Sequence, residues 1–272
     1  MLYSPVLSFL RIFPLTIWTI FCSFMQLIFF SLGKQKFFIF YRLFFKGLAK
    51  IFGIKIICKG NIEKHNVLYV SNHVSYLDII LLGSNLDGIF VAKSEISKWP
   101  FINKLCRLGR TIFVERQNRL KAKEQTNFIG KKLNSGYNVI LFPEGTSSDG
   151  KKVLPFKSSL LGAIEFDSKK FFLIQPVSIT YTKLDGIPVD NKFRPFFAWF
   201  GGMDLISHAW KFMGLGVSEV KINFHKAKEF SSFKDRKEAT RYSFKCISSQ
   251  VSENNKSIEI ENKIKLYEFK CL

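Results

Sequence analysis

A histidine and an aspartate five positions apart, His73 and Asp78, are the residue pair with the clearest capacity for chemistry. They follow the apolar run VLYVS, which predicts a buried strand over residues 67–71, and Ser75 is a favourable N-cap for a helix. Asp78 then lies in the first helical turn, from which its carboxylate reaches back to one imidazole nitrogen. The carboxylate would fix the tautomer and stabilise the imidazolium, and the other nitrogen would take a proton. The pair predicts a general base, although a first-turn aspartate is also favoured by the helix dipole alone.

Arginines gather in the segment GRTIFVERQNR, residues 109–119, around the end of a predicted strand. Arg110, Arg116 and Arg119 each offer a planar fork of N–H donors that matches a phosphate or a carboxylate. The segment therefore indicates a candidate anion site. A solvated basic loop would have the same composition.

A tight turn is predicted at FPEGT, where Pro143 and Gly145 bracket Glu144 directly after the apolar run NVIL. This turn presents Glu144 at the carboxyl end of the sheet, where open α/β sheets bind their ligands. Backbone donors of the turn and the lysines that follow it would suit an anion, and an ordinary strand-to-helix turn is the alternative. Those lysines are Lys151, Lys152 and Lys157.

Apolar runs that alternate with helical stretches position these residues. The pattern predicts an α/β fold with a mixed central sheet flanked by helices. Strands are predicted at residues 54–60, 67–71, 88–93, 110–116, 138–145, 171–181 and 218–225. Helices are predicted at residues 75–83, 100–109, 119–136, 158–166 and, on the surface, 230–251.

The N-terminal segment favours a membrane. Residues 12–33 contain no charged residue and would span about 33 Å as a helix, enough for a bilayer core. Residues 34–53 then alternate lysine and arginine with phenylalanine and leucine, as in a helix that lies among lipid headgroups. No small-x-small signal-peptidase site follows. The basic residues after the apolar run predict a cytoplasmic catalytic domain. A spanning helix and one arm of a hairpin that dips into one leaflet both fit, and a buried soluble helix is the third reading.

Composition supports a cationic protein at a membrane surface. The 272 residues carry a net charge of +20, and 47% of them are hydrophobic and 16% aromatic, which excludes a disordered basic tail. Base composition of the genome could account for part of the lysine and phenylalanine. The five cysteines are far apart and form no zinc-ligand spacing with histidine, so free thiols and no metal are expected. The predicted division is an anchor at 1–52, a catalytic domain at 53–253 and a polar C-terminal tail at 254–272.

The order of the motifs is more specific than any one of them. HxxxxD, GxxxFVxR, FPEGT and a proline-valine pair at Pro176 follow one another at intervals of about 30 residues. In this order they resemble the glycerolipid acyltransferase family, which includes the lysophosphatidic acid acyltransferases. The resemblance covers roughly residues 53–179, and the amphipathic N-terminal segment extends it.

The resemblance implies a role for each matching residue. His73 would be the general base and Asp78 its orienting partner, and Arg116 would hold a phosphate or headgroup. No cofactor or metal is implied, since acyl-CoA or acyl carrier protein brings an activated thioester to a lipid hydroxyl. The implied acceptor-binding residues are Gly109, Arg110, Phe113, Arg116, Glu144, Gly145, Thr146 and Lys157.

The implied product is phosphatidic acid, made from 1-acylglycerol-3-phosphate in phospholipid biosynthesis. One departure keeps the acceptor open, because Ser147 stands where many family members have arginine after Glu-Gly-Thr. The segment SSDGKKVLPFK is more similar to the lyso-ornithine-lipid acyltransferase branch, which is the alternative. A lipid hydrolase using the same pair is a remote rival, and no GxSxG elbow is present. A cationic protein that binds membranes or nucleic acid without catalysis explains none of the ordered motifs, so we expect membrane lipids and no nucleic acid as partners.

Overall fold

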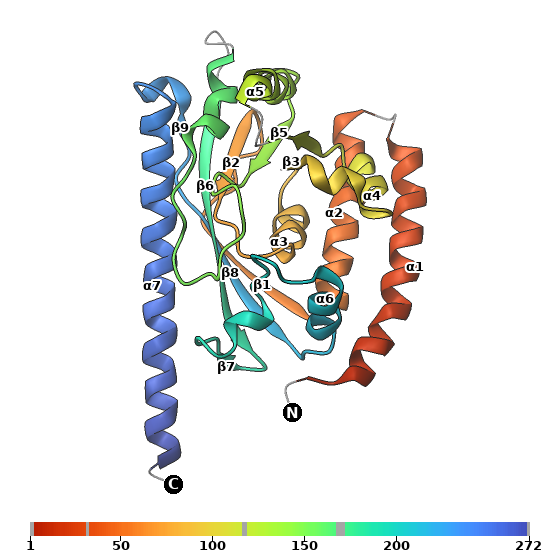
Figure 1. Cartoon of the computed structure of the whole chain (residues 1–272), viewed down its shortest axis with the longest axis vertical. Helices are drawn as coiled ribbons and strands as arrows, with labels where there is room; N and C mark the ends of the chain where they lie inside the picture. Colours follow the sequence, from red (N-terminus) through yellow and green to blue (C-terminus); the bar gives the residue numbers. More distant parts are fainter. Residues whose placement is uncertain (1–2, 31–32, 116–118, 167–171, 271–272) are drawn as a thin grey trace.

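The computed structural model describes residues 3–30, 33–115, 119–166 and 172–270. Over these ranges the chain folds as a mixed sheet between helical layers, with α7 on one side and α1, α2 and α3 on the other (Figure 1). This confirms the predicted α/β class with its central mixed sheet, flanking helices and N-terminal apolar helical segment.

The sheet has nine strands within the described residues. Its main path runs β1-β8-β6-β2-β5-β3-β4, and the short strands β7 and β9 pair with β6. The strands from β6 to β4 along this path are parallel, whereas β8 and β1 run the other way. The strands are β1 (Ile54–Lys59), β2 (Val67–Ser71), β3 (Gly88–Lys93), β4 (Ile112–Val114), β5 (Asn138–Leu141), β6 (Leu173–Leu184), β7 (Ile187–Pro188), β8 (Ser218–Phe224) and β9 (Lys228–Glu229).

The parallel strands explain where the motifs meet. Every residue of β2 and of β5 is buried, as expected for short apolar runs covered on both faces. Because parallel strands end at the same edge of a sheet, the turns after β2 and β5 lie next to each other. His73 follows the first of these strands and Glu144 follows the second.

Helices cover both faces of the sheet. The α-helices are α1 (Pro5–Phe29), α2 (Lys34–Ile51), α3 (Leu77–Asn85), α4 (Ile102–Leu108), α5 (Arg119–Asn134), α6 (Leu205–Met213) and α7 (Arg236–Lys270). Short 3₁₀ helices are η1 (Ser94–Lys98), η2 (Ser158–Phe166), η3 (Arg194–Phe196) and η4 (Phe230–Ser232).

The N-terminal helices α1 and α2 pack side by side as an antiparallel hairpin (Figure 1). They approach closely at Gly47, where an added Cβ would lie 2.0 Å from Nε1 of Trp18. That indole N–H donates to the carbonyl of Phe44 at 3.1 Å. Helix α2 also packs on α3, so the hairpin is attached directly to the helix that carries Asp78.

Polar contacts hold the beginning of α1 against α6 and the residues after it. The hydroxyl of Ser8 donates to the carbonyl of Trp210 at 2.9 Å. Nη1 of Arg11 donates to the carbonyls of Met213 and Leu215 at 2.9 and 2.7 Å. The opposite side of α1 exposes many large apolar side chains, among them Phe9, Phe13 and Phe24. In the described chain α1 is the one helix long and apolar enough to cross a membrane.

The C-terminal helix differs from its prediction. A surface helix over 230–251 and a polar tail over 254–272 were expected, whereas α7 runs without a break from Arg236 to Lys270. The boundary between 253 and 254 therefore falls inside a helix. Asn254 and Asn255 look like tail residues in the sequence, but both are buried, and Asn254 donates to the hydroxyl of Thr180 at 3.1 Å. Asn255 donates to the carbonyls of Gly150 and Lys151 at 3.2 and 3.0 Å, so the partners of the two amides lie on β6 and in the turn after β5.

Candidate active site

His73 and Asp78 meet as the sequence predicts. Nδ1 of His73 lies 2.8 Å from Oδ2 of Asp78. The carboxylate is fully buried, while the imidazole retains 19% of its exposure. Because the carboxylate only accepts hydrogen bonds, Nδ1 carries the hydrogen and Nε2 is the basic nitrogen. Among the described residues Nε2 has no hydrogen-bond partner, so it is the atom available to a substrate proton.

Three further donors hold the Asp78 carboxylate. The backbone N–H groups of Val74 and Ser75 donate to Oδ2 at 2.7 and 2.9 Å, and the Tyr181 hydroxyl donates to Oδ1 at 2.8 Å. Burial and the Asp78 carboxylate raise the pKa of Tyr181 well above its usual value, so its hydroxyl stays a donor. Hydrogen bonds to a carboxylate favour its charged form, which offsets the cost of burying it.

The backbone of His73 is clamped from the neighbouring turn. Its N–H donates to Oε1 of Glu144 at 2.8 Å, and its carbonyl accepts from the N–H and the hydroxyl of Ser148 at 2.9 and 3.2 Å. The imidazole stacks on the ring of Phe142 with centroids 4.2 Å apart. The turn after β5 therefore fixes both the position of the His73 backbone and the plane of its imidazole ring.

Glu144 is a clamp rather than an exposed ligand. Its side chain is buried, and Oε2 accepts from the N–H of Leu154 at 2.9 Å while Oε1 holds His73. Burial raises the pKa of Glu144 to about 7, with a smaller contribution from the Asp78 charge, while the two N–H donors act in the opposite direction. The prediction that Glu144 binds the acceptor is untested; in this structure its carboxyl group is almost fully buried and holds two backbone N–H groups.

Replacing Glu144 by glutamine is expected to destabilise the fold and to lower acyl transfer. The amide nitrogen must face the N–H of either His73 or Leu154, so one hydrogen bond is lost and two donors oppose each other. Loss of such a buried partner costs about 1–3 kcal/mol of unfolding free energy. Denaturant unfolding measures this, with the exposed Glu259→Gln in α7 as the control, which should stay within about 0.5 kcal/mol. A Glu144→Gln variant as stable and active as the wild type would contradict the clamp.

The difference in unfolding free energy between the wild type and Glu144→Gln is also expected to depend on pH. With its folded pKa raised, Glu144 binds a proton more tightly in the folded chain than in the unfolded chain. Its contribution to stability is thus fully present below the unfolded pKa of 4.5 and is lost as pH rises through about 7. The unfolding free energy of the wild type relative to Glu144→Gln should fall in that window by at most about 1.4 kcal/mol per pH unit. A flat difference would contradict the raised pKa.

The predicted acceptor-binding residues Gly109 and Phe113 lie on or next to β4, at the far end of the sheet edge that carries His73. Phe113 is half-buried on β4, three strands from β2, which at ~4.8 Å per strand is about 14 Å. Gly109 ends α4 against the ring of Tyr41, where a Cβ would come within 3.3 Å. Arg116 lies outside the described residues.

Arg110 is placed differently from its prediction. Its guanidinium lies over the rings of Phe30 and Phe37 at 4.6 and 4.3 Å and donates to the carbonyl of Phe30 at 2.6 Å and to the hydroxyl of Tyr137. These contacts join the tip of the α1–α2 hairpin to the catalytic sheet. Arg110 therefore acts as a link to the hairpin, which a residue pattern could not show because its hairpin partners Phe37 and Phe30 are 73 and 80 positions away.

The remaining predicted residues lie at the turn after β5. Gly145 has φ +77°, a conformation that favours glycine, and a Cβ there would come within 3.1 Å of Nζ of Lys157. Thr146 is exposed, and Ser147 is half-buried. The structure thus brings Gly145, Thr146 and Lys157 together beside His73, and leaves Gly109 and Phe113 at the other end of the edge.

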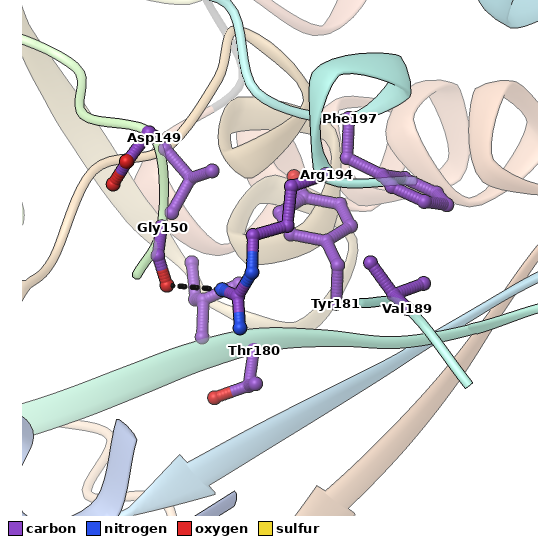
Figure 2. A pocket seen from close by; sticks show the side chains of 9 residues that line it. Asp149, Gly150, Thr180, Tyr181, Val189, Arg194 and Phe197 are labelled. Carbon is purple, nitrogen blue, oxygen red and sulfur yellow. Dashed lines mark hydrogen bonds between the residues drawn. The ribbon is translucent and has the colours of Figure 1, made fainter. Parts of the chain in front are cut away.

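Sequence reasoning missed the side chains behind the catalytic turn. A cavity of about 10 Å³, lined by Gly150, Thr180, Tyr181, Arg194 and others, lies there (Figure 2). It has room for about one water and so cannot hold a lipid. Nη1 of Arg194 donates to the carbonyl of Gly150 at 2.8 Å, as Figure 2 shows. Asn255 of α7 donates to the same carbonyl at 3.2 Å. Both side chains therefore hold the turn that carries Ser148 and, through it, His73.

No group of three or more potential metal ligands occurs within the described residues. The expectation that no cofactor is needed stays a prediction.

Comparisons with known proteins agree with this geometry. Residues 53–180 match the family model described as Acyltransferase. This match and the relatives named below identify the chain as an O-acyltransferase, and the paired His73 and Asp78 fit that class.

More specifically, the chain belongs to the glycerolipid acyltransferase family. It is 37% identical over 196 residues to the lyso-ornithine lipid O-acyltransferase of Rhizobium meliloti (strain 1021), covering 70% of this chain and 67% of the relative. It is 30% identical over 173 residues to the 1-acyl-sn-glycerol-3-phosphate acyltransferase of Neisseria gonorrhoeae, covering 63% and 64%. The crystal structure of the 1-acyl-sn-glycerophosphate acyltransferase PlsC from Thermotoga maritima shares the fold, with a TM-score of 0.67 over 91% of this chain and 94% of that one at 22% identity.

Proposed function

We propose that this O-acyltransferase moves a fatty acyl group from a thioester donor to the free hydroxyl of a lyso-ornithine lipid. The observation that carries the reaction is the free Nε2 of His73 held opposite the buried Asp78. Nε2 removes the proton as the acceptor oxygen attacks the thioester carbonyl, the tetrahedral intermediate collapses, and the thiol leaves with that proton. No covalent enzyme intermediate is required, because the thioester is already activated.

The acceptor assignment rests on the charges around the catalytic turn. A phosphomonoester acceptor needs a cluster of fixed cations, and arginine is the residue best suited to that task. Ser147 stands where many family members have arginine, and the guanidinium of Arg110 is occupied by the hairpin. Asp149 adds a negative charge two residues beyond Ser147. An ornithine headgroup carries a primary amine as well as a carboxylate, so it needs fewer fixed cations than a phosphomonoester does.

Lysophosphatidic acid is the second candidate acceptor. The relative from Neisseria gonorrhoeae carries that activity in its name. Lys157 lies against Gly145 beside the catalytic turn and supplies one cation there. The two candidates therefore differ in the number of cations that the headgroup needs.

We also propose that acyl-CoA or acyl carrier protein is the donor and that the enzyme works on the cytoplasmic side of a membrane. Both donors are anionic, and a protein of net charge +20 attracts either. The outer side of α1 supplies the apolar surface for membrane binding. The beginning of α1 is hydrogen-bonded to Trp210, Met213 and Leu215 of the catalytic domain, so the helix lies against that domain. A helix held in this way fits insertion into one leaflet better than a helix that spans the bilayer.

The acceptor is tested by presenting both lysolipids to the purified full-length enzyme. With either acyl-CoA or acyl carrier protein as donor, we expect diacylated ornithine lipid to form at least about 10-fold faster than phosphatidic acid, measured by mass spectrometry. A tenfold ratio corresponds to about 1.4 kcal/mol of transition-state discrimination. Faster formation of phosphatidic acid would favour the second candidate, and release of free fatty acid without either product would indicate a hydrolase.

A further inference from the structure

The segment that joins β3 to α4 presents an exposed aromatic side chain. Phe101 is 78% exposed and lies directly before α4, in the sequence Lys98-Trp-Pro-Phe-Ile102. Its φ is +62° and its ψ is −52°, a strained conformation for a bulky residue. The ring points outward while the backbone is strained. Because an exposed ring makes few contacts that could offset this strain, packing does not explain the conformation.

The surroundings of Phe101 match a lipid surface. Ile102 beside it is 38% exposed, and neither η1 nor α4 contains a buried residue. From the start of η1 to the end of α4, residues 94–108 carry three basic side chains, Lys98, Lys104 and Arg107, and one acidic side chain, Glu95. An apolar tip surrounded by cations is the combination that anionic bilayers attract, because the ring enters the acyl region while the cations remain at the headgroups.

The position of α4 makes this surface continuous with the hairpin. Helix α4 contacts α1 and lies beside the C-terminal half of that helix in Figure 1. The residue two positions after α4, Arg110, donates to the carbonyl of Phe30 just beyond the end of α1. Phe101, at the other end of the short helix α4, is therefore close to the C-terminal end of α1, where Phe24, Leu27 and Ile28 are exposed.

The same segment begins at the catalytic edge of the sheet. Strand β3 is parallel to β5 and β5 to β2, so Ser94 at the start of η1 leaves the sheet on the edge where His73 lies. A lipid contact in this segment would border the path by which an acceptor moves from the bilayer to Nε2 of His73.

We propose that Phe101 and its basic flanks form a second membrane-insertion point, separate in sequence from the α1–α2 hairpin and adjacent to the active site. The inference rests on the proposed membrane-bound acyl transfer. Its occupant is an anionic bilayer.

The first test places an environment-sensitive fluorophore, NBD, on single cysteines in a full-length chain whose five native cysteines are replaced by serine. The three sites are Phe101→Cys, Phe13→Cys on the outer side of α1, and Ile187→Cys on β7, which is 40% exposed and far from α4 in Figure 1. With vesicles of phosphatidylglycerol and phosphatidylethanolamine, emission at 101 and 13 should shift to the blue and rise several-fold, and emission at 187 should not change.

The three sites separate the possible failures. A response at 13 without one at 101 overturns the second insertion point and leaves membrane docking by the hairpin intact. If neither the probe at 13 nor the probe at 101 responds, membrane docking itself is overturned. A response at all three sites indicates adsorption without a defined face and also overturns the proposal.

A second test needs no label and leaves the native cysteines in place. Glycine adopts φ +62° without strain, so Phe101→Gly should fold with an unchanged or higher Tm. The lipid concentration for half-maximal vesicle binding should rise about 10-fold, because one large apolar side chain no longer enters the bilayer. Ile187→Ser is the control and should bind as the wild type does. A lower Tm with unchanged vesicle binding would show that Phe101 serves packing and would overturn the proposal.

Discussion

Replacing His73 by alanine is expected to lower the rate of acyl transfer about 10²–10⁴-fold, the usual contribution of a general base. The reason is specific to Nε2, since no other imidazole within the described residues is paired with a buried carboxylate in this way. The measurement is kcat/KM with lysolipid and acyl donor. Circular dichroism and thermal unfolding check that the variant is folded at the assay temperature.

His65→Ala is the matched control for this variant. His65 is exposed in the loop before β2, eight residues from His73, and its loss should leave the rate unchanged. Near-normal transfer by a folded His73→Ala protein would overturn the mechanism, and an equal loss in both variants would indicate damage to the fold.

Replacing Asp78 by asparagine is expected to have an effect of the same order, about 10²–10⁴-fold on kcat. The asparagine oxygen can still accept from Val74, Ser75 and His73, and its amide can face the hydroxyl of Tyr181. The fold is thus preserved at a cost of about 1–3 kcal/mol, whereas the negative charge that stabilises the imidazolium is lost. Kinetics and denaturant unfolding of the same preparation separate the two effects.

Tyr181→Phe is the control that separates charge from geometry. It removes one hydrogen bond to Oδ1 and leaves the carboxylate charged, so it should cost about 1.5–3 kcal/mol of stability and less than about 10-fold in rate. If Tyr181→Phe slows the reaction as much as Asp78→Asn does, orientation of the carboxylate and not its charge is the main contribution.

The sequence predicts local geometry well. The His73–Asp78 contact depends on a strand, a short turn and one helical turn, all within twelve residues, so pattern reasoning could place both side chains. The seven main strands follow from short runs rich in apolar residues, of which β2 and β5 are buried on both sides. Tyr181 could not be found in the same way, because it reaches Asp78 only through the pairing of β6 with β2, and a tyrosine on a strand is otherwise ordinary.

The contacts that the sequence did not predict belong to residues whose partners are distant in the chain. Arg110 carries the charge expected of an anion ligand, but the aromatic residues that surround it belong to the hairpin. Glu144 follows β5 as predicted, yet its carboxylate bonds two backbone N–H groups that no local pattern identifies. In α7 the buried amides of Asn254 and Asn255 imitate a polar tail, because their partners lie on β6 and in the turn at Gly150.

The pairing of the edge strand β1 has a consequence for synthesis. In the sheet as described, β1 pairs with β8, which the ribosome completes about 165 residues after the end of β1. At ~5–20 residues per second that interval is about 10–30 s. The α1–α2 hairpin precedes β1, and its contacts with α6 wait almost as long. Throughout this time the beginning of α1 lacks its partner α6, although α2 can already pack on α3, which is complete about 35 residues after α2 ends. Any apolar surface that this part of α1 meets in that interval, a bilayer or another nascent chain, therefore competes before the native partner exists.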